Sequence, residues 1–319
     1  MRFRFQLLLK SLAVAAKGMF IRKDMLVQFF LRDLTVVLLS VLSITPGGSL
    51  NLADTPCGTA KAGLPSGHYY HRIPKIVGGV AALPGEYPWI VSIKWAYGSH
   101  FCGGTIVDRR HIISAAHCFH DFTLRTQEPS AMEVTIGEHL QNGLEQPVDS
   151  IRIKVQSIRL HPAYKAESKL NDIAVLTLQD NITWSSTVQP ACLPDPSQFQ
   201  PPNTGITAGW GATDTFRSSS DVLRKVQVPI WNNDTCLKLL RNRLNYNGNG
   251  SEQMCAGGRN LKDSCDGDSG SPLMALYTNQ LHVVGIVSGG LVLECGKPGL
   301  PSLYTRVANY INWIQQSLV

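Results

Sequence analysis

From Trp89 onward the chain is a series of short apolar and β-branched runs, each bounded by Gly, Pro, Asn or Asp. The clearest runs are "WIVSIKW", "TIVDRRHIISAAH", "MEVTIG", "IRIKVQSIRL", "DIAVLTL", "RKVQVPI", "LHVVGIVSG" and "LYTRV". Strands at such short intervals indicate an all-β sandwich or barrel, not alternating βα units. Only the C-terminal segment has a helical period, with an apolar stripe formed by Val307, Tyr310, Ile311, Ile314 and Leu318.

Basic charge is concentrated at the N-terminus. The formal net charge is +6, but residues 1–33 alone contain seven Lys or Arg residues and two Asp residues. The rest of the chain is close to neutral, which argues against nucleic acid or an anionic membrane as the main partner. The apolar run Leu34–Ile44 is typical of a signal-peptide core and is too short to span a bilayer. A retained signal anchor and a mitochondrial presequence are the alternatives, and Met25 is a second candidate start.

Cysteine usage favours an oxidising compartment. The chain has an even number of cysteines, and no two have the C-x-x-C spacing of a zinc or redox site. Four disulfides in an exported protein are the simpler interpretation. Glycosylation sequons at Asn181, Asn233 and Asn249 fit a secreted surface. The sequence therefore predicts an extracellular protein.

Three segments are expected. Residues 1–50 form a leader with a signal peptide, and residues 51–75 form a Gly-, Pro- and Thr-rich propeptide or light chain without strand or helix period. Residues 76–319 contain all the strand-like runs and are expected to form the functional domain.

The stretch "DSCDGDSGSP" raises the question of a nucleophile at Ser269. A serine hydroxyl needs a base to accept its proton, and the base needs a third group to fix its tautomer. His117 in "IISAAHCF" and Asp172 in "NDIAVLTL" are the candidates. Taken singly, such a histidine is usually structural and such an aspartate is usually a turn residue. Their order along the chain, His, Asp, Ser with wide gaps, favours a catalytic triad.

Six blocks resemble the signatures of the chymotrypsin-like (trypsin family) serine proteases, in that family's order and spacing. They are "IVGG" from Ile76, "HFCGGTIV" from His100, "SAAHC" from Ser114, "NDIAVLTL" from Asn171, "AGWGAT" from Ala208 and "DSCDGDSGSP" from Asp263. The resemblance covers Ile76 to Val319 and is greatest to arthropod members of extracellular cascades. It implies two six-stranded antiparallel β-barrels with a C-terminal α-helix, and a secreted endopeptidase that acts through an acyl-enzyme.

By the same resemblance, Ser269 is the nucleophile, His117 the general base and Asp172 the group that orients the imidazole. The backbone N–H groups of Gly267 and Ser269 would form the oxyanion hole. Asp263 would lie at the base of the specificity pocket and select Arg or Lys.

Activation and the rest of the pocket also follow from the resemblance. Cleavage after Lys75 would free the amino group of Ile76, which would pair with the buried Asp268 carboxylate. Ser92 and His100 match positions that hold this aspartate in some zymogens. The remaining residues expected to bind substrate are Ser288, Gly290 and Ser302.

The implied disulfides are Cys102–Cys118, Cys236–Cys255, Cys265–Cys295 and Cys57–Cys192, the last tethering the propeptide. Three residues depart from the family pattern. Ser271 and Ser302 each stand where a glycine is common, and Gly289 stands where a tryptophan is usual. Because Ser302 adds a hydroxymethyl group to the pocket wall, we expect a narrower pocket.

No cofactor is expected. Glu138 and Glu145 lie where some relatives bind calcium. A hard-cation site needs several oxygen ligands, however, and this segment has few acidic residues. The expected partners are protein substrates, an activating trypsin-like protease and serpin-type inhibitors, with a monomeric enzyme. Two other hypotheses remain: an inactive protease homologue that acts as a binding or adaptor protein, and an enzyme tethered through an uncleaved Leu34–Ile44.

Overall fold

The structure, a computed structural model, describes residues 56–60, 79–120, 125–141, 150–200, 202–212, 219–244, 251–259, 262–289 and 295–319. Several predicted features lie outside these ranges: the leader with Leu34–Ile44, most of the propeptide, Lys75, Ile76, Glu145, Asn249 and Gly290. Within the described ranges no helix combines the length and the apolar content needed to cross a membrane.

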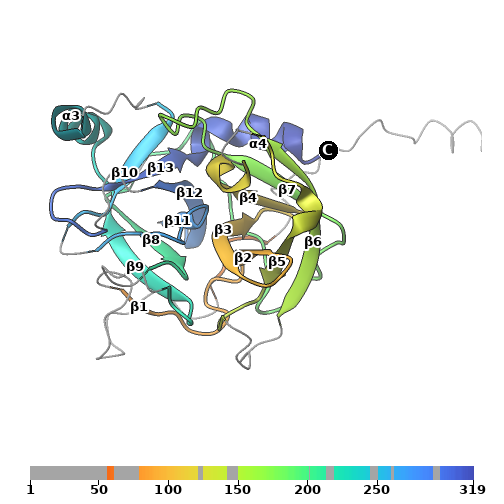
Figure 1. The fold of residues 1–319 in the computed structure, drawn as a ribbon. Helices are drawn as coiled ribbons and strands as arrows, with labels where there is room; N and C mark the ends of the chain where they lie inside the picture. The colour runs from red at the N-terminus through yellow and green to blue at the C-terminus, as the bar shows by residue number, and fades with distance from the viewer. Residues whose placement is uncertain are drawn as a thin grey trace, which may run out of the picture. The chain divides into compact units, whose positions relative to one another are not determined.

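Six antiparallel strands close into a barrel, called here the first barrel (Figure 1). In pairing order they are β2 (Ile90–Trp95), β3 (His100–Ile106), β4 (His111–Ser114), β7 (Ala174–Leu178), β6 (Ile151–Leu160) and β5 (Met132–Ile136). Five of them come from runs predicted as strands, whereas only Thr105 and Ile106 of β3 lie in such a run. Their inward apolar side chains, including Ile93, Ile112, Val134 and Leu176, are fully buried and form its core.

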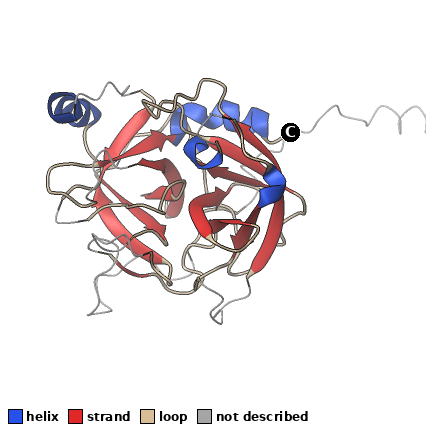
Figure 2. Cartoon of the chain, viewed as in Figure 1, coloured by secondary structure: helices blue, strands red, loops and turns tan. Residues whose placement is uncertain are grey.

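A seven-stranded antiparallel sheet, called here the second sheet, forms the other half. In pairing order it contains β1 (Val80–Ala81), β9 (Arg224–Pro229), β8 (Thr204–Gly209), β11 (Pro272–Tyr277), β12 (Gln280–Gly289), β13 (Ser302–Arg306) and β10 (Gln253–Ala256). An isolated bridge between Ile230 and Ala256 links the end of β9 to β10, so these strands curl toward closure. Strands dominate the molecule (Figure 2), which confirms the all-β class.

The C-terminal helix is present, and a second helix was not predicted. A 3₁₀ turn, η4 (Val307–Tyr310), leads into α4 (Ile311–Ser317), and the whole predicted stripe is buried. The unpredicted helix is α3 (Asn233–Leu244). It begins after Asn232, whose side-chain oxygen accepts a hydrogen bond from the Thr235 N–H at 3.2 Å. Two further 3₁₀ turns are η2 (Ala116–Phe119) and η3 (Pro129–Ala131).

The four disulfides of the structure have the pairing that the family resemblance implied: Cys57–Cys192, Cys102–Cys118, Cys236–Cys255 and Cys265–Cys295. Around the first of these, the short segment 56–60 is docked on the domain. The Gly58 N–H donates to the Pro190 carbonyl at 3.0 Å, and the Leu281 N–H donates to the Gly58 carbonyl at 2.9 Å. This part of the predicted propeptide is therefore bound by backbone hydrogen bonds as well as by a covalent link.

Candidate active site

Asp172, which lies just before β7, is buried and orients His117. One carboxylate oxygen, Oδ2, is 2.8 Å from His117 Nδ1, and the other accepts the His117 backbone N–H at 2.8 Å. The Ser288 hydroxyl donates to Oδ2 at 2.5 Å. Although burial alone would raise it, the charge and hydrogen bond of His117 hold the pKa of Asp172 below its ordinary value. The carboxylate thus stays ionised and leaves His117 Nε2 as the nitrogen that can accept a proton.

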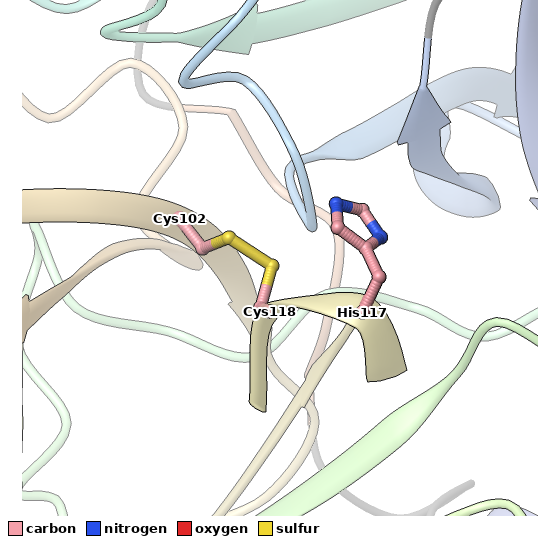
Figure 3. A group of neighbouring side chains, drawn as sticks. All are labelled: Cys102, His117 and Cys118. Atoms are coloured by element: carbon pink, nitrogen blue, oxygen red, sulfur yellow. A yellow bond between two sulfur atoms is a disulfide. The ribbon is translucent and has the colours of Figure 1, made fainter. Parts of the chain in front are cut away.

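His117 is fixed by its place in η2. The next residue, Cys118, is bonded to Cys102 of β3, and Figure 3 shows the imidazole beside this disulfide. The three side chains bring two sulfurs and a ring nitrogen close together, a geometry that resembles a metal site. Because the sulfurs are bonded to each other and Nδ1 faces Asp172, this group is a structural clamp for the histidine.

The loop that carries Ser269 is attached to the same end of the first barrel. The Gly103 N–H of β3 donates to the Ser269 carbonyl at 2.7 Å. Gly270 has φ +80°, and a Cβ there would overlap the Ser114 hydroxyl and the Gly103 carbonyl. Only glycine allows this close approach. The backbone of Ser269 is therefore anchored beside the strand whose disulfide holds His117, although within the described chain no hydrogen bond yet joins Ser269 Oγ to His117.

Two backbone donors in this loop are left over. The N–H groups of Asp268, Gly270 and Ser271 donate to carbonyls within the protein at 2.8–2.9 Å. No described acceptor is bonded to the N–H of Gly267 or of Ser269. Gly267 has φ +89°, a turn that glycine adopts without strain. Two unused donors on either side of Asp268 are what an oxyanion hole requires.

Asp268 is buried between backbone donors. Its carboxylate accepts the N–H of Gly211 and that of Cys265, both at 2.9 Å. Burial raises the pKa of Asp268 to about 6. The sequence suggested that Ser92 and His100 hold this carboxylate, but His100 Nε2 instead lies 3.0 Å from the carbonyl oxygen of Gly267.

Asp263 is also buried, near the start of the same loop. It accepts the N–H of Ser264 at 3.0 Å and that of Gly296 at 3.3 Å, and the Ser302 hydroxyl is hydrogen-bonded to it. Burial raises the pKa of the Asp263 carboxyl to about 7, although these hydrogen bonds favour the ionised form. The residue has no described cationic partner, so a cationic ligand would supply the missing charge.

The three departures from the family pattern have distinct surroundings. The Ser271 hydroxyl is buried without a hydrogen-bond partner among the described residues, and it occupies space that the missing side chains of Gly103 and Gly209 leave open. A Cβ on Gly289 would meet no atom of the described residues within 4 Å. Ser302 lies in β13 with its hydroxyl on Asp263, as described above.

Sequence reasoning missed two supports of the triad. Ser288, expected to bind substrate, has its hydroxyl on Asp172. Thr305 of β13 was not singled out, and its hydroxyl donates to the Asp172 carbonyl at 2.7 Å. A hydroxyl residue within a buried strand is the only signal that the sequence offers for either. Among the sequon asparagines, Asn181 is exposed and Asn233 is half-buried at the start of α3.

Of the suggested calcium segment, the structure describes Glu138 but not Glu145. The Glu138 carboxylate pairs with the Lys94 ammonium at 2.5 Å, and both side chains are buried. A hard cation requires several free oxygen ligands, and this carboxylate already has a positive partner.

Comparison with known proteins agrees with this geometry. The family model described as Trypsin matches residues 76–314. The chain is 35% identical over 257 residues to the proclotting enzyme of Tachypleus tridentatus, an alignment that covers 77% of this chain and 66% of that protein. It is 34% identical over 262 residues to the CLIP domain-containing serine protease B4 of Anopheles gambiae, covering 76% and 70%.

A third relative, transmembrane protease serine 9 of Rattus norvegicus, is 36% identical over 244 residues, covering 75% of this chain and 22% of that protein. The chain thus spans slightly less than two-thirds of the proclotting enzyme and under a quarter of the rat protein. The family model, by contrast, covers most of the present chain. The chain therefore belongs to the trypsin family of serine endopeptidases.

Proposed function

We propose that this protein is a secreted, trypsin-like endopeptidase, made as a zymogen and activated by cleavage after Lys75, that hydrolyses peptide bonds after Arg or Lys. The observation that carries the catalytic part is the Asp172–His117 pair, set beside a serine loop with two unused N–H donors. An extracellular cascade is supported by the names of the proclotting enzyme and the CLIP-domain protease. Its partners are protein substrates, an activating protease that cuts after lysine and serpin-type inhibitors, and the enzyme acts as a monomer.

The chemistry follows from the proton acceptors and donors of the site. Ser269 Oγ attacks the scissile carbonyl as its proton moves to His117 Nε2, and the developing oxyanion accepts the N–H groups of Gly267 and Ser269. His117 then gives the proton to the leaving amine, which forms the acyl-enzyme. Water attacks the acyl group with His117 again as base, which releases the acid and restores Ser269. Asp172 stabilises the imidazolium at both steps.

Zymogen activation is supported by the state of Asp268. Among the described residues, only backbone N–H groups donate hydrogen bonds to the buried Asp268 carboxylate. A cation placed beside it would stabilise its ionised form. The amino group that cleavage creates at Ile76 would be that cation. Pairing would hold the loop that carries the oxyanion donors, and Cys57–Cys192 would keep the released segment attached.

Specificity is tested by two pocket variants. The wild-type enzyme should prefer Arg and Lys, because a neutral substrate side chain would leave the buried Asp263 carboxylate unpaired. In the enzyme cleaved at Lys75, Asp263→Ser should erase this preference. Ser302→Gly should raise kcat/KM on Arg and Lys peptides without changing their rank over Phe, because one hydroxymethyl costs only about 1–3 kcal/mol. The measurement is kcat/KM for matched Arg, Lys, Phe and Ala peptides. A wild-type preference for Phe or Ala would show that pocket shape governs specificity, and no turnover at all would favour the adaptor hypothesis.

Benzamidine, a cation that occupies such a pocket without reacting, should bind in a pH-dependent manner. Burial raises the pKa of Asp263 to about 7, so below that pH the free carboxyl is increasingly neutral and must lose a proton to bind the cation. We expect the affinity to fall by about tenfold per pH unit below about 7 and to level off above it. The inhibition constant between pH 5 and pH 9 measures this. Asp263→Ser should give a flat profile, and a flat wild-type profile would contradict the proposed role of Asp263.

A further inference from the structure

Lys94 of β2 and Glu138, which follows β5, form a buried ion pair on the face of β2 opposite to the barrel core. The Lys94 ammonium lies 2.5 Å from Glu138 Oε1, and the two side chains are 2% and 4% exposed. Burial raises the pKa of Glu138, while its hydrogen bond and charge contact with Lys94 favour the ionised form. Such pairs seldom add stability over apolar residues of similar size. The pair therefore calls for another explanation.

From this pair a chain of hydrogen bonds, buried at Gln141 and part-buried at His100, runs to the oxyanion loop. Gln141 Nε2 lies 3.1 Å from Glu138 Oε2 and 3.1 Å from Ser92 Oγ. Ser92 Oγ lies 2.8 Å from His100 Nδ1, and His100 Nε2 lies 3.0 Å from the carbonyl oxygen of Gly267. The last residue is the one whose N–H is an unused oxyanion donor.

The Ser92 hydroxyl lies within reach of both the Glu138 carboxylate and His100 Nδ1, and the partners at the two ends of the chain decide which of them receives its proton. A carboxylate only accepts, so Gln141 must turn its NH₂ group toward Glu138, and its second N–H then points at Ser92. The Gly267 carbonyl also only accepts, so His100 Nε2 must carry a proton. Burial lowers the pKa of His100 to about 4, so the ring is neutral and its Nδ1 accepts the Ser92 proton. The Glu138 carboxylate at one end and the Gly267 carbonyl at the other therefore require the same donor-to-acceptor direction along the chain of hydrogen bonds.

Gln141 is held where the two halves of the molecule meet. Its N–H donates to the Asp221 carbonyl at 2.7 Å, and the neighbouring His139 carbonyl accepts the Leu223 N–H at 2.8 Å. Residues 221–223 lead into β9 of the second sheet, whereas Ser92 lies in β2 of the first barrel. The backbone of Gln141 is thus attached to the segment before β9, while its side chain contacts Ser92 of the first barrel.

We infer that Lys94, Glu138 and Gln141 are positioning residues for the oxyanion hole. The ion pair fixes the orientation of the Gln141 amide, and this orientation commits the Ser92 proton to His100. His100 then holds the Gly267 carbonyl and, with it, the direction of the Gly267 N–H. The inference deepens the proposed function and depends on it, because it concerns the same oxyanion hole.

Gln141→Glu is the sharpest test, since it changes the donor group with little change in size. Beside the buried Glu138 carboxylate the new carboxyl group must share a proton with Glu138, which leaves its other oxygen facing Ser92 as an acceptor. This oxygen attracts the Ser92 proton, so His100 loses the partner that fixes its tautomer. In the enzyme cleaved at Lys75 we expect kcat to fall about tenfold with KM within about twofold. A peptide aldehyde ending in arginine, whose adduct with Ser269 uses the oxyanion hole, should bind about tenfold more weakly. Benzamidine, which uses the pocket alone, should bind unchanged.

Two further variants separate positioning from loss of stability. Ile136→Ala opens a cavity in β5 near Glu138 without touching the hydrogen-bond chain, and it should lower the melting temperature while leaving the ratio of the two inhibition constants unchanged. In a Ser92→Ala background, Gln141→Glu should weaken aldehyde binding little further, because both act through one chain.

The outcomes distinguish this inference from the proposed function. A wild-type enzyme that hydrolyses none of the peptides would overturn the proposed function and this inference with it. An active wild type whose Gln141→Glu variant binds the aldehyde as tightly as before would overturn the inference alone. Equal weakening of aldehyde and benzamidine, or full additivity with Ser92→Ala, would also overturn it.

Discussion

Ser269→Ala is expected to lower turnover by on the order of 10⁶-fold, because no other group in the site can form the acyl-enzyme. Folding should be preserved. The structure anchors Ser269 through its backbone carbonyl, which accepts the Gly103 N–H at 2.7 Å, and alanine retains that carbonyl. Benzamidine affinity should also be preserved, since Asp263 is untouched.

The test compares kcat on an arginine peptide for wild type and variant, both cleaved at Lys75, with melting temperature and benzamidine affinity as measures of folding. Ser271→Ala is the matched control, because it removes a neighbouring hydroxyl that has no hydrogen-bond partner in the part of the chain that the structure describes. It should keep most of the wild-type turnover. Wild-type turnover in Ser269→Ala would show that the nucleophile lies elsewhere.

After treatment with the activating protease, Lys75→Gln is expected to be at least about 10³-fold less active than wild type. Both oxyanion donors depend on an ordered loop, and loss of one donor alone lowers kcat by about 10²–10³-fold. Without cleavage no amino group forms at Ile76. The buried Asp268 carboxylate then keeps only its two backbone donors, the N–H groups of Gly211 and Cys265.

The measurement is kcat/KM after treatment with a protease that cuts after lysine, with N-terminal sequencing to locate the cut. Lys61→Gln, a change at another lysine of the predicted propeptide, is the matched control and should activate normally. Cleaved wild-type protein should separate into two chains only after reduction, because Cys57–Cys192 joins them. Full activity of uncleaved Lys75→Gln protein would contradict zymogen activation.

The strands were predictable where side chains carry the signal. "IRIKVQSIRL" became β6, because alternating β-branched and charged residues suit a half-buried strand. β8 was missed because "TGITAG" contains two glycines and an alanine, which have weak strand propensity. β11 was missed because it begins with a proline, and pairing with β8 and β12 decides its conformation. α3 was missed since its apolar stripe is short and its start depends on the Asn232 side chain.

The candidate site was only partly predictable, for a similar reason. His117, Asp172 and Ser269 lie in distinctive motifs, so their order along the chain pointed to a triad. Lys94 in "WIVSIKW" and Gln141 in "HLQNG" carry no such signal. A lysine in a strand is expected to face solvent, and only the folded structure shows the buried carboxylate that pairs with it. Residues that act through several segments distant in sequence have no local pattern.

The placement of the site across two sheets has a consequence for biosynthesis. His117 and Asp172 belong to the first barrel, whereas Asp263, Ser269 and Ser288 belong to the loops and strands of the second sheet. With the roles proposed above, a nascent chain in which only one half has folded has the general base without the nucleophile, or the nucleophile without the base. A half-folded chain therefore cannot hydrolyse proteins of the cell that makes it. Docking of the two halves limits proteolysis before the propeptide has any effect.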